Sequence, residues 1–374
     1  IALHTPLLQP DAPLDCPALQ TALSNALRPV VVMGQQAFTP AWDTVMARLQ
    51  AQGIVVLCEP LACDAPGTPV DALMALAATT NLVLPDFILY IGGTIVSKRL
   101  KEYLRRATNA ACWVVNEDGA VYDTFQNLQG VVQASPIALL RVLTWQGADT
   151  WQQAWSTLAR RVETGLARYV PPFSSLHVVQ CFERLLMAHA DKPVVHYANS
   201  MAVRMGCLYA QHYVYCNRGV NGIEGSLSTA AGQSLATDDD VFCVIGDLSF
   251  FYDHNALWNQ HLRGNLRILL LNNGGGAIFG KFAGLRASDA REPFVMGAHH
   301  TSAKGICAAY DVAYHAATSP ADCAALLPVL IKQQSRRPVL LEVFTNSETD
   351  ACAYEDLFRQ LTTMDDDRAS TPQQ

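Results

Sequence analysis

Short apolar runs that end in polar turns recur along the whole chain. In the first part of the sequence they predict strands at residues 30–33, 54–58, 87–91 and 111–116, and helices at residues 41–52, 98–106 and 145–170. Strands and helices that alternate in this way are typical of a parallel, Rossmann-like sheet.

A second alternating series follows the Pro171-Pro172-Phe173 linker. It opens with an amphipathic helix at residues 176–190 and continues with predicted strands at residues 194–198, 212–216, 241–245, 268–271, 312–315 and 339–344. We therefore expect an α/β protein with two Rossmann-like parallel-sheet domains, one at residues 1–170 and one at residues 171–374.

The length and composition agree with this division. At about 150 residues per domain, 374 residues form two or three domains, each large enough to bury its own core. No apolar stretch of about 18 residues is free of charges and helix breakers, so neither a membrane span nor a membrane partner is expected. The polar tail from residue 362 onward is expected to be frayed.

The cysteines and the net charge indicate the cellular setting and the kinds of partner to expect. Eleven cysteines are scattered without a Cys-x-x-Cys pair, which predicts core thiols in a reducing, cytoplasmic setting rather than disulfides or a zinc site. The net charge is −7 and no long basic run occurs, so nucleic acid is not an expected partner. Because the sequence starts at Ile1 without a Met, we expect it to begin inside a longer gene product.

Two polar turns follow strands in the second series. Gly246-Asp247 ends one apolar run, and Asn272-Asn273-Gly274-Gly275-Gly276 ends the next. In a parallel sheet such turns lie side by side at the carboxyl edge, where open α/β folds bind ligands. The carboxylate of one turn and the amide and carbonyl oxygens of the other suit Mg²⁺ held together with a diphosphate. Residues 251–261 are expected to form the crossover helix, and two ordinary strand–helix turns are the alternative.

Three cationic clusters also follow predicted strands. Ser200 and Arg204 come after one strand, and Arg218 comes after the next. Because guanidinium groups bind carboxylates bidentately, these arginines predict a carboxylate pocket. Lys98 and Arg99 form a third cluster in the first domain. Helix caps and solvated surface charges are the alternatives for these residues.

The motifs occur in the order Asn-Ser-x-x-x-Arg, Asn-Arg-Gly-x-x-Gly-Ile-Glu-Gly, Gly-Asp-Leu-Ser-Phe and Asn-Asn-Gly-Gly-Gly-x-Ile-Phe. In this order they resemble the 2-succinyl-5-enolpyruvyl-6-hydroxy-3-cyclohexene-1-carboxylate synthase family, thiamine diphosphate enzymes of menaquinone biosynthesis. The resemblance is strongest over residues 194–282, and Ser97-Lys98-Arg99-Leu100 matches a further family motif. Leu248 stands where thiamine diphosphate enzymes generally have glycine, which narrows the family.

The resemblance implies a role for each matching residue. The implied metal ligands are Asp247, Asn273 and the carbonyl of Gly275. The implied cofactor-binding residues are Asn221, Gly222, Ile223, Gly246, Asp247, Leu248, Ser249, Asn273, Gly275 and Ile278, with Ile223 as the bulky residue that supports the bent cofactor. The implied catalytic residues are Ser200, Arg204, Arg218, Lys98 and Arg99, which hold substrate carboxylates, and Ile278 and Phe279, which form an apolar wall beside the reactive carbon.

The resemblance also implies a reaction. Family members are decarboxylating carboligases that join 2-oxoglutarate to isochorismate, with thiamine diphosphate and Mg²⁺, or Mn²⁺ in its place. A homodimer or homotetramer is implied, because the family holds the cofactor between two subunits. The family has pyrimidine-binding, central and diphosphate-binding domains, and this sequence matches the last two. Because the first of these supplies the glutamate that activates the cofactor, we expect the chain alone to be an inactive fragment.

Two alternatives stay open. Another thiamine diphosphate-dependent 2-oxo acid decarboxylase or carboligase, such as an acetohydroxyacid synthase relative, usually keeps glycine at the position of Leu248 and requires no such arginine set. A non-catalytic module would bind Mg²⁺ and a diphosphate without turnover. The lack of a match to the glutamate-bearing domain favours that second alternative for the isolated chain.

Overall fold

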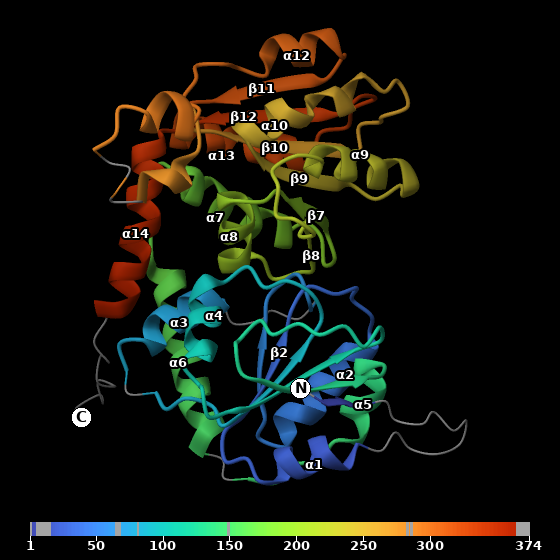
Figure 1. Cartoon of the computed structure of the whole chain (residues 1–374). Coiled ribbons are helices and arrows are strands. Elements are labelled where there is room, and N and C mark those ends of the chain that lie inside the picture. Colours follow the sequence, from blue (N-terminus) through green and yellow to red (C-terminus); the bar gives the residue numbers. More distant parts are fainter. Residues whose placement is uncertain are drawn as a thin grey trace, which may run out of the picture. The chain divides into compact units, whose positions relative to one another are not determined.

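The computed structural model describes residues 2–4, 16–63, 69–80, 82–147, 150–281, 284 and 287–363. The chain divides into two compact units. The first comprises residues 1–63, 67–169 and 356–374, and the second comprises residues 64–66 and 170–355. Each unit contains a six-stranded parallel sheet with flanking helices, so the expected pair of Rossmann-like α/β folds is confirmed (Figure 1).

The sheet of the first unit has the strand order β1-β6-β5-β4-β2-β3. These strands are β1 (Ala2–His4), β2 (Pro29–Met33), β3 (Val55–Cys58), β4 (Phe87–Ile91), β5 (Ala111–Asn116) and β6 (Leu128–Gln133). The helices are α1 (Pro17–Ser24), α2 (Ala41–Ala51), α3 (Val70–Ala77), α4 (Lys98–Arg105), α5 (Pro136–Val142) and α6 (Thr150–Arg168). The four predicted strands are confirmed, and β1 and β6 extend the sheet beyond them.

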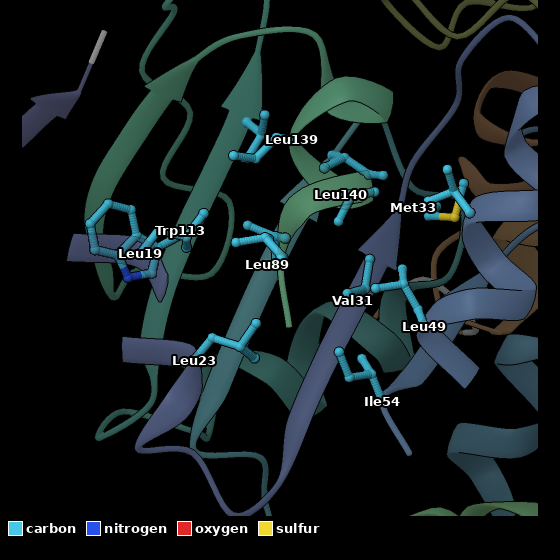
Figure 2. Close-up of a cluster of buried hydrophobic side chains, with 14 of the residues drawn as sticks. Leu19, Leu23, Val31, Met33, Leu49, Ile54, Leu89, Trp113, Leu139 and Leu140 are labelled. Carbon is cyan, nitrogen blue, oxygen red and sulfur yellow. The ribbon is translucent and has the colours of Figure 1, made fainter. Parts of the chain in front are cut away.

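One core of this unit lies between a face of its sheet and helices α1, α2 and α5. Strand residues point alternately to the two faces, so every second residue of β2 and β4 enters this core. Figure 2 shows part of the cluster, with labelled side chains from the strands and from all three helices: Leu19, Leu23, Val31, Met33, Leu49, Leu89, Trp113, Leu139 and Leu140. Burying each such aliphatic side chain contributes about 1.5–3 kcal/mol. Of the three helices, only α2 was predicted from the apolar pattern, whereas α1 and α5 were not.

The sheet of the second unit has the order β11-β12-β10-β9-β7-β8. Its strands are β7 (Val194–Tyr197), β8 (Val214–Tyr215), β9 (Val241–Gly246), β10 (Leu266–Asn272), β11 (Ala313–Ala317) and β12 (Val339–Phe344). Its helices are α7 (Ser175–Met187), α8 (Met201–Tyr209), α9 (Ser226–Ala236), α10 (Asp247–Asp253), α12 (Lys304–Ala309), α13 (Pro320–Lys332) and the first part of α14 (Ser347–Thr363). Its described residues also include three short helices: η1 (His254–Trp258), η2 (Ala277–Lys281) and η3 (Arg291–Val295).

All six strands predicted for the second unit are confirmed. The chain passes from β7 to β8 on one side and then to β9 on the other side of β7. A topological switch point therefore lies between β7 and β9, and open parallel sheets bind ligands at the carboxyl end of such a point.

The predicted crossover helix at residues 251–261 is wrong in position. Helix α10 starts at Asp247, directly after β9, and the helical path ends with η1 at Trp258. The guanidinium of Arg337 donates to the carbonyls of Gln260 and Leu262 at 3.2 and 2.7 Å. These carbonyls therefore accept hydrogen bonds from a distant side chain and not from the backbone amides of a continuing helix.

The predicted helix at residues 145–170 also begins too early. Helix α6 starts at Thr150, whereas Trp145 is only 3% exposed and belongs to the core cluster of the first unit. The indole Nε1 of Trp145 donates to the carbonyl of Ala26 at 2.9 Å. This tertiary contact holds Trp145 in an irregular segment. The residue was included in the predicted helix because it is apolar, like the buried residues of α6.

The prediction of thiols without disulfides is corrected at one position. Cys58 and Cys63 form a disulfide in the first unit. The chain turns back after β3, and their Cα atoms lie 6.7 Å apart, within reach of a bridge. Most of the other cysteines are buried thiols, including Cys112 and Cys243 in strands β5 and β9, as predicted.

Within the described part of the chain, none of the helices combines the length and apolar character required to cross a membrane. Thr362 and Thr363 continue α14, so the first two residues of the predicted frayed tail are helical. The rest of that predicted tail lies outside the described residues.

Candidate active site

The polar turns meet at the carboxyl edge of the second sheet. Strands β9 and β10 pair in parallel with Gly246 opposite Leu271, so Asp247, the first residue after β9, follows at the level of Asn272, the last residue of β10. Strand β7 adds the turn that begins at Asn199. The switch point between β7 and β9 is thus bordered by three of the predicted motifs.

Asp247 joins the two turns that were predicted to meet. It is the first residue of α10 and only 3% exposed. Its Oδ1 accepts a hydrogen bond from the amide of Leu248 at 2.7 Å, and its Oδ2 accepts from the amides of Gly274 and Gly275 at 2.8 and 2.9 Å. The Nε2 of His299 lies 3.3 Å from the same Oδ2.

The surroundings of Asp247 act on its pKa in two directions. Burial raises the pKa above the usual carboxyl range, while the hydrogen bond from Leu248, the nearby His299 and the amides of Gly275 and Gly274 act against that rise. A carboxylate held in a buried position is stabilised further by any cation that reaches it. The site therefore favours a positively charged ligand.

Asn273 presents an amide oxygen to the same region. Its Nδ2 donates to Oδ2 of Asp350 at 2.7 Å. Its Oδ1 is buried and accepts no hydrogen bond from the described residues. Nearly all buried polar atoms in proteins have a partner, so this amide oxygen is available to a ligand.

Two glycines shape the backbone around these side chains. Gly275 has φ 150°, and an added Cβ would lie 2.9 Å from the carbonyl oxygen of Met296, so a side chain does not fit there. The Gly275 carbonyl accepts from the amide of Ala277 at 3.1 Å and keeps a second lone pair. An added Cβ at Gly246 meets nothing within 4 Å, so the end of β9 borders open space.

A cavity of about 900 Å³ adjoins this turn, and its lining includes Asn273, Gly274 and His299. Of the three proposed metal ligands, Asn273 lines this cavity, whereas Asp247 and Gly275 are not among its lining residues. Together the three fit an Mg²⁺–diphosphate site, because a carboxylate, an amide oxygen and a backbone carbonyl are all hard oxygen ligands. Among the described residues, no group of three or more His, Cys, Asp or Glu side chains is placed to hold a metal ion. A metal at this edge would therefore depend on the mixed set of Asp247, Asn273 and Gly275.

Asn199 organises the loops on the other side of the switch point. It is 3% exposed, and its Nδ2 donates to the carbonyls of Asn217 and Gly222 at 2.6 and 2.5 Å. Its Oδ1 accepts from Nη1 of Arg218 at 2.8 Å. Arg218 therefore helps to hold the loop that also carries Asn221, which has φ 60°.

Ser200 stands at the start of α8 in an unusual backbone conformation. Its φ is 71° and ψ is −127°, and its side chain makes no capping hydrogen bond. The alternative of a side-chain helix cap therefore does not hold for Ser200. Strained non-glycine residues of this kind concentrate at functional sites. Arg204 follows within α8 and is half-buried.

Ser249 and Leu248, two of the predicted cofactor-binding residues, also donate hydrogen bonds within the protein. The Oγ of Ser249 donates to the carbonyl of Ile223, and the amide of Leu248 donates to Asp247. The first contact ties the loop before α9 to helix α10. It positions the half-buried Ile223 at the carboxyl edge of the sheet.

The remaining predicted residues lie in η2 and in the first unit. Ile278 is half-buried in η2, and Phe279 beside it is 37% exposed. Lys98 and Arg99 begin α4 in the first unit, where Lys98 is exposed. Arg99 forms a salt bridge with Asp71, and its guanidinium lies 4.1 Å from the ring centroid of Phe358.

Two family models match the chain at these places. The model described as "Middle domain of thiamine pyrophosphate" matches residues 20–191. The model described as "Thiamine pyrophosphate enzyme, C-terminal TPP binding domain" matches residues 197–343 and so includes both turns around Asp247 and Asn273.

Relatives named 2-succinyl-5-enolpyruvyl-6-hydroxy-3-cyclohexene-1-carboxylate synthase are similar over most of the chain. The protein of Bacteroides thetaiotaomicron is 34% identical over 352 residues, which cover 91% of this chain and 62% of the relative. That of Bacteroides fragilis strain ATCC 25285 is 37% identical over 309 residues, covering 79% and 54%. That of Desulfotalea psychrophila is 32% identical over 311 residues, covering 79% and 55%.

The chain belongs to this synthase family. It spans between about half and two thirds of the length of the relatives just named. Three residues that organise the site in this synthase-family chain received no role from the sequence: Asn199, which opens the Asn-Ser-x-x-x-Arg motif, His299 and Asp350. Asn199 had a signal, its place directly after a strand, whereas His299 and Asp350 lie far from the motifs and are recognised only by their contacts.

Proposed function

We propose that this chain carries the diphosphate-binding part of a thiamine diphosphate-dependent carboligase that decarboxylates 2-oxoglutarate and joins it to isochorismate. The observation that carries the proposal is the buried Oδ1 of Asn273, which accepts no hydrogen bond from the described residues, on the turn joined to the carboxylate of Asp247. Membership of the synthase family supports the choice of reaction and product.

In this proposal Mg²⁺, or Mn²⁺ in its place, binds Asp247, the Oδ1 of Asn273 and the carbonyl of Gly275. The open space beside Gly246 would accommodate the diphosphate. The nearby chain segments at residues 221–223 and 248–249 complete its cradle. Oxygen ligands and backbone amides at a strand–helix turn are what a metal-bound diphosphate requires.

Thiamine diphosphate, when bound, supplies the electron sink for loss of CO₂. The chain contributes orientation and exclusion of water. Ile223 would support the cofactor at the sheet edge, and Ile278 and Phe279 would provide apolar surface that excludes water from the reaction. The cationic and polar residues that bind the substrate carboxylates are Ser200, Arg204, Arg218, Lys98 and Arg99.

The proposal includes a homodimer or homotetramer, which rests on the family resemblance. It also includes a cytoplasmic location, which the nine free cysteines among the described residues support and the Cys58–Cys63 disulfide does not.

The decisive experiment measures thiamine diphosphate binding by calorimetry with and without Mg²⁺. Asp247→Ala should abolish the Mg²⁺-dependent binding, because it removes one carboxylate from a small octahedral shell. Asp191→Ala, at an exposed position before β7, is the matched control and should bind as the native chain does. Unchanged Mg²⁺-dependent affinity in Asp247→Ala would contradict the proposed site.

The substrate is tested separately, in protein that turns over. Decarboxylation of 2-oxoglutarate in preference to pyruvate is expected, because the arginine set suits a dicarboxylate. Preference for pyruvate would favour the other thiamine diphosphate carboligases instead.

A further inference from the structure

We propose that Asp350 is a positioning residue that sets the orientation of the Asn273 side chain at the metal site, an inference that rests on the proposed function. The two residues are distant in sequence, one after β10 and the other in α14. Their side chains meet at 2.7 Å, with Nδ2 of Asn273 donating to Oδ2 of Asp350.

Asp350 is surrounded by donors. It is 7% exposed, and its Oδ1 accepts from the amide of Ser175 at 2.7 Å. Its Oδ2 accepts from the Oγ of Ser175 at 2.5 Å, from the Oγ1 of Thr345 at 3.2 Å and from Asn273. These contacts hold the carboxylate in place, so Asp350 acts on the site through Asn273.

The orientation of an asparagine amide decides what it offers to a cation. The two orientations of the amide group differ by the exchange of the oxygen, an acceptor, and the NH₂ group, a donor. An ionised carboxylate accepts hydrogen bonds and donates none, so Asp350 selects the orientation in which the NH₂ group faces it. The Oδ1 of Asn273 is then directed away from Asp350, where it is buried and accepts no hydrogen bond from the described residues.

Asp350→Asn tests this directly. The amide of Ser175 belongs to the backbone and cannot reverse, so the new side chain must turn its oxygen toward Ser175 and its NH₂ toward Asn273. Two NH₂ groups repel each other, so Asn273 must rotate and direct its own NH₂ into the metal site. We expect the affinity for Mn²⁺, measured by electron paramagnetic resonance in the presence of thiamine diphosphate, to fall by about 10-fold or more.

The exchange Asn273→Asp/Asp350→Asn restores the match between donor and acceptor. The NH₂ group now comes from position 350, and a carboxylate at position 273 accepts it with one oxygen and offers the other to the metal. Mn²⁺ affinity should return to within about 3-fold of the native value, a small change beside the 10–100-fold typical of lost supporting contacts. Ser175→Ala removes a different donor to Asp350 and leaves the contact with Asn273 in place. Its Mn²⁺ affinity should therefore also stay within about 3-fold of the native value.

The outcomes separate the inference from the proposed function. Native Mn²⁺ affinity in Asp350→Asn, or no recovery in the exchanged pair, would overturn the positioning role while leaving the site itself in place. Equal Mn²⁺ binding by the native chain and Asp247→Ala would overturn the proposed metal site and the inference together. Thermal unfolding of each variant identifies loss of fold, and the exchanged pair keeps the test valid if Asp350→Asn alone is unstable.

Discussion

The buried carboxylate of Glu342 accepts a hydrogen bond of 2.7 Å from the side-chain amide of Asn272, the residue directly before the proposed metal ligand Asn273. Glu342 lies in β12 and is 0% exposed. It also accepts from Ser302 Oγ at 2.8 Å and from the hydroxyl of Tyr314 at 2.7 Å. One acidic side chain therefore ties the end of β10 to two other segments of the second unit.

Glu342→Gln should lower the free energy of unfolding by about 3 kcal/mol, because it places an NH₂ group among buried donors. Tyr314→Phe is the matched control, since it removes one donor and leaves the carboxylate with the others. It should cost about 1 kcal/mol. Urea unfolding of both variants measures the two losses in free energy of unfolding. Equal losses would show that the carboxylate of Glu342 does not stabilise the fold by accepting hydrogen bonds from several donors.

Arg204→Ala should weaken substrate use much more than cofactor binding in protein that turns over. A lost charge-assisted contact to a carboxylate costs roughly 1.5–3 kcal/mol, or about 10- to 150-fold in kcat/KM. The measurements are kcat/KM for 2-oxoglutarate and Kd for thiamine diphosphate, with the exposed Arg184→Ala as control. Equal losses in both quantities would indicate a structural role for Arg204.

Arg218→Ala should lower substrate use in the same way, but it should also lower stability. The reason is the 2.8 Å hydrogen bond from its Nη1 to Asn199, which holds the loop before α9. We expect a loss of about 1.5–3 kcal/mol in the free energy of unfolding, the range for hydrogen bonds of charged groups. Native stability in this variant would show that Arg218 serves the substrate alone.

His196 should make the stability depend on pH. Burial lowers its pKa from 6.5 to about 4, although the hydrogen bond to Gln233 acts in the opposite direction. Between these pH values the folded protein binds fewer protons than the unfolded chain, so the stabilisation is complete above pH 6.5 and is lost as the pH falls toward 4. The loss should reach about 3 kcal/mol at most.

His196→Gln removes this titration while keeping a polar side chain at the position. Urea unfolding at several pH values should therefore show a steeper fall in stability for the native protein than for the variant. Parallel profiles would show that protonation of His196 does not differ between the folded and unfolded states.

Gly34→Ala should destabilise the first unit, because the new Cβ would lie 2.0 Å from the carbonyl oxygen of Gly93 and neither backbone moves easily. We expect a loss of about 3 kcal/mol. Gly232→Ala is the contrasting variant, since its Cβ in α9 meets nothing within 4 Å. It should stabilise that helix by about 0.5–1 kcal/mol, and thermal unfolding of both variants checks the difference in sign.

Local patterns in the chain were enough to predict the alternation of strands and helices in both units and the two turns that meet at Asp247 and Gly274. The apolar runs of β9 and β10 are short, continuous and followed at once by polar residues, so their burial and their ends are local properties of the chain. Since neighbouring parallel strands end at one edge, that local pattern was enough to bring the two turns together.

Contacts between distant segments, by contrast, establish which side chains support that edge. Asp350, Glu342 and His299 resemble ordinary polar residues in the sequence, because a donor–acceptor match between distant segments leaves no periodic pattern. The same reason explains the misplaced crossover helix, whose end is held by Arg337. Local patterns therefore predicted where the proposed ligands lie, and the contacts of buried polar atoms across the fold decided which way they face.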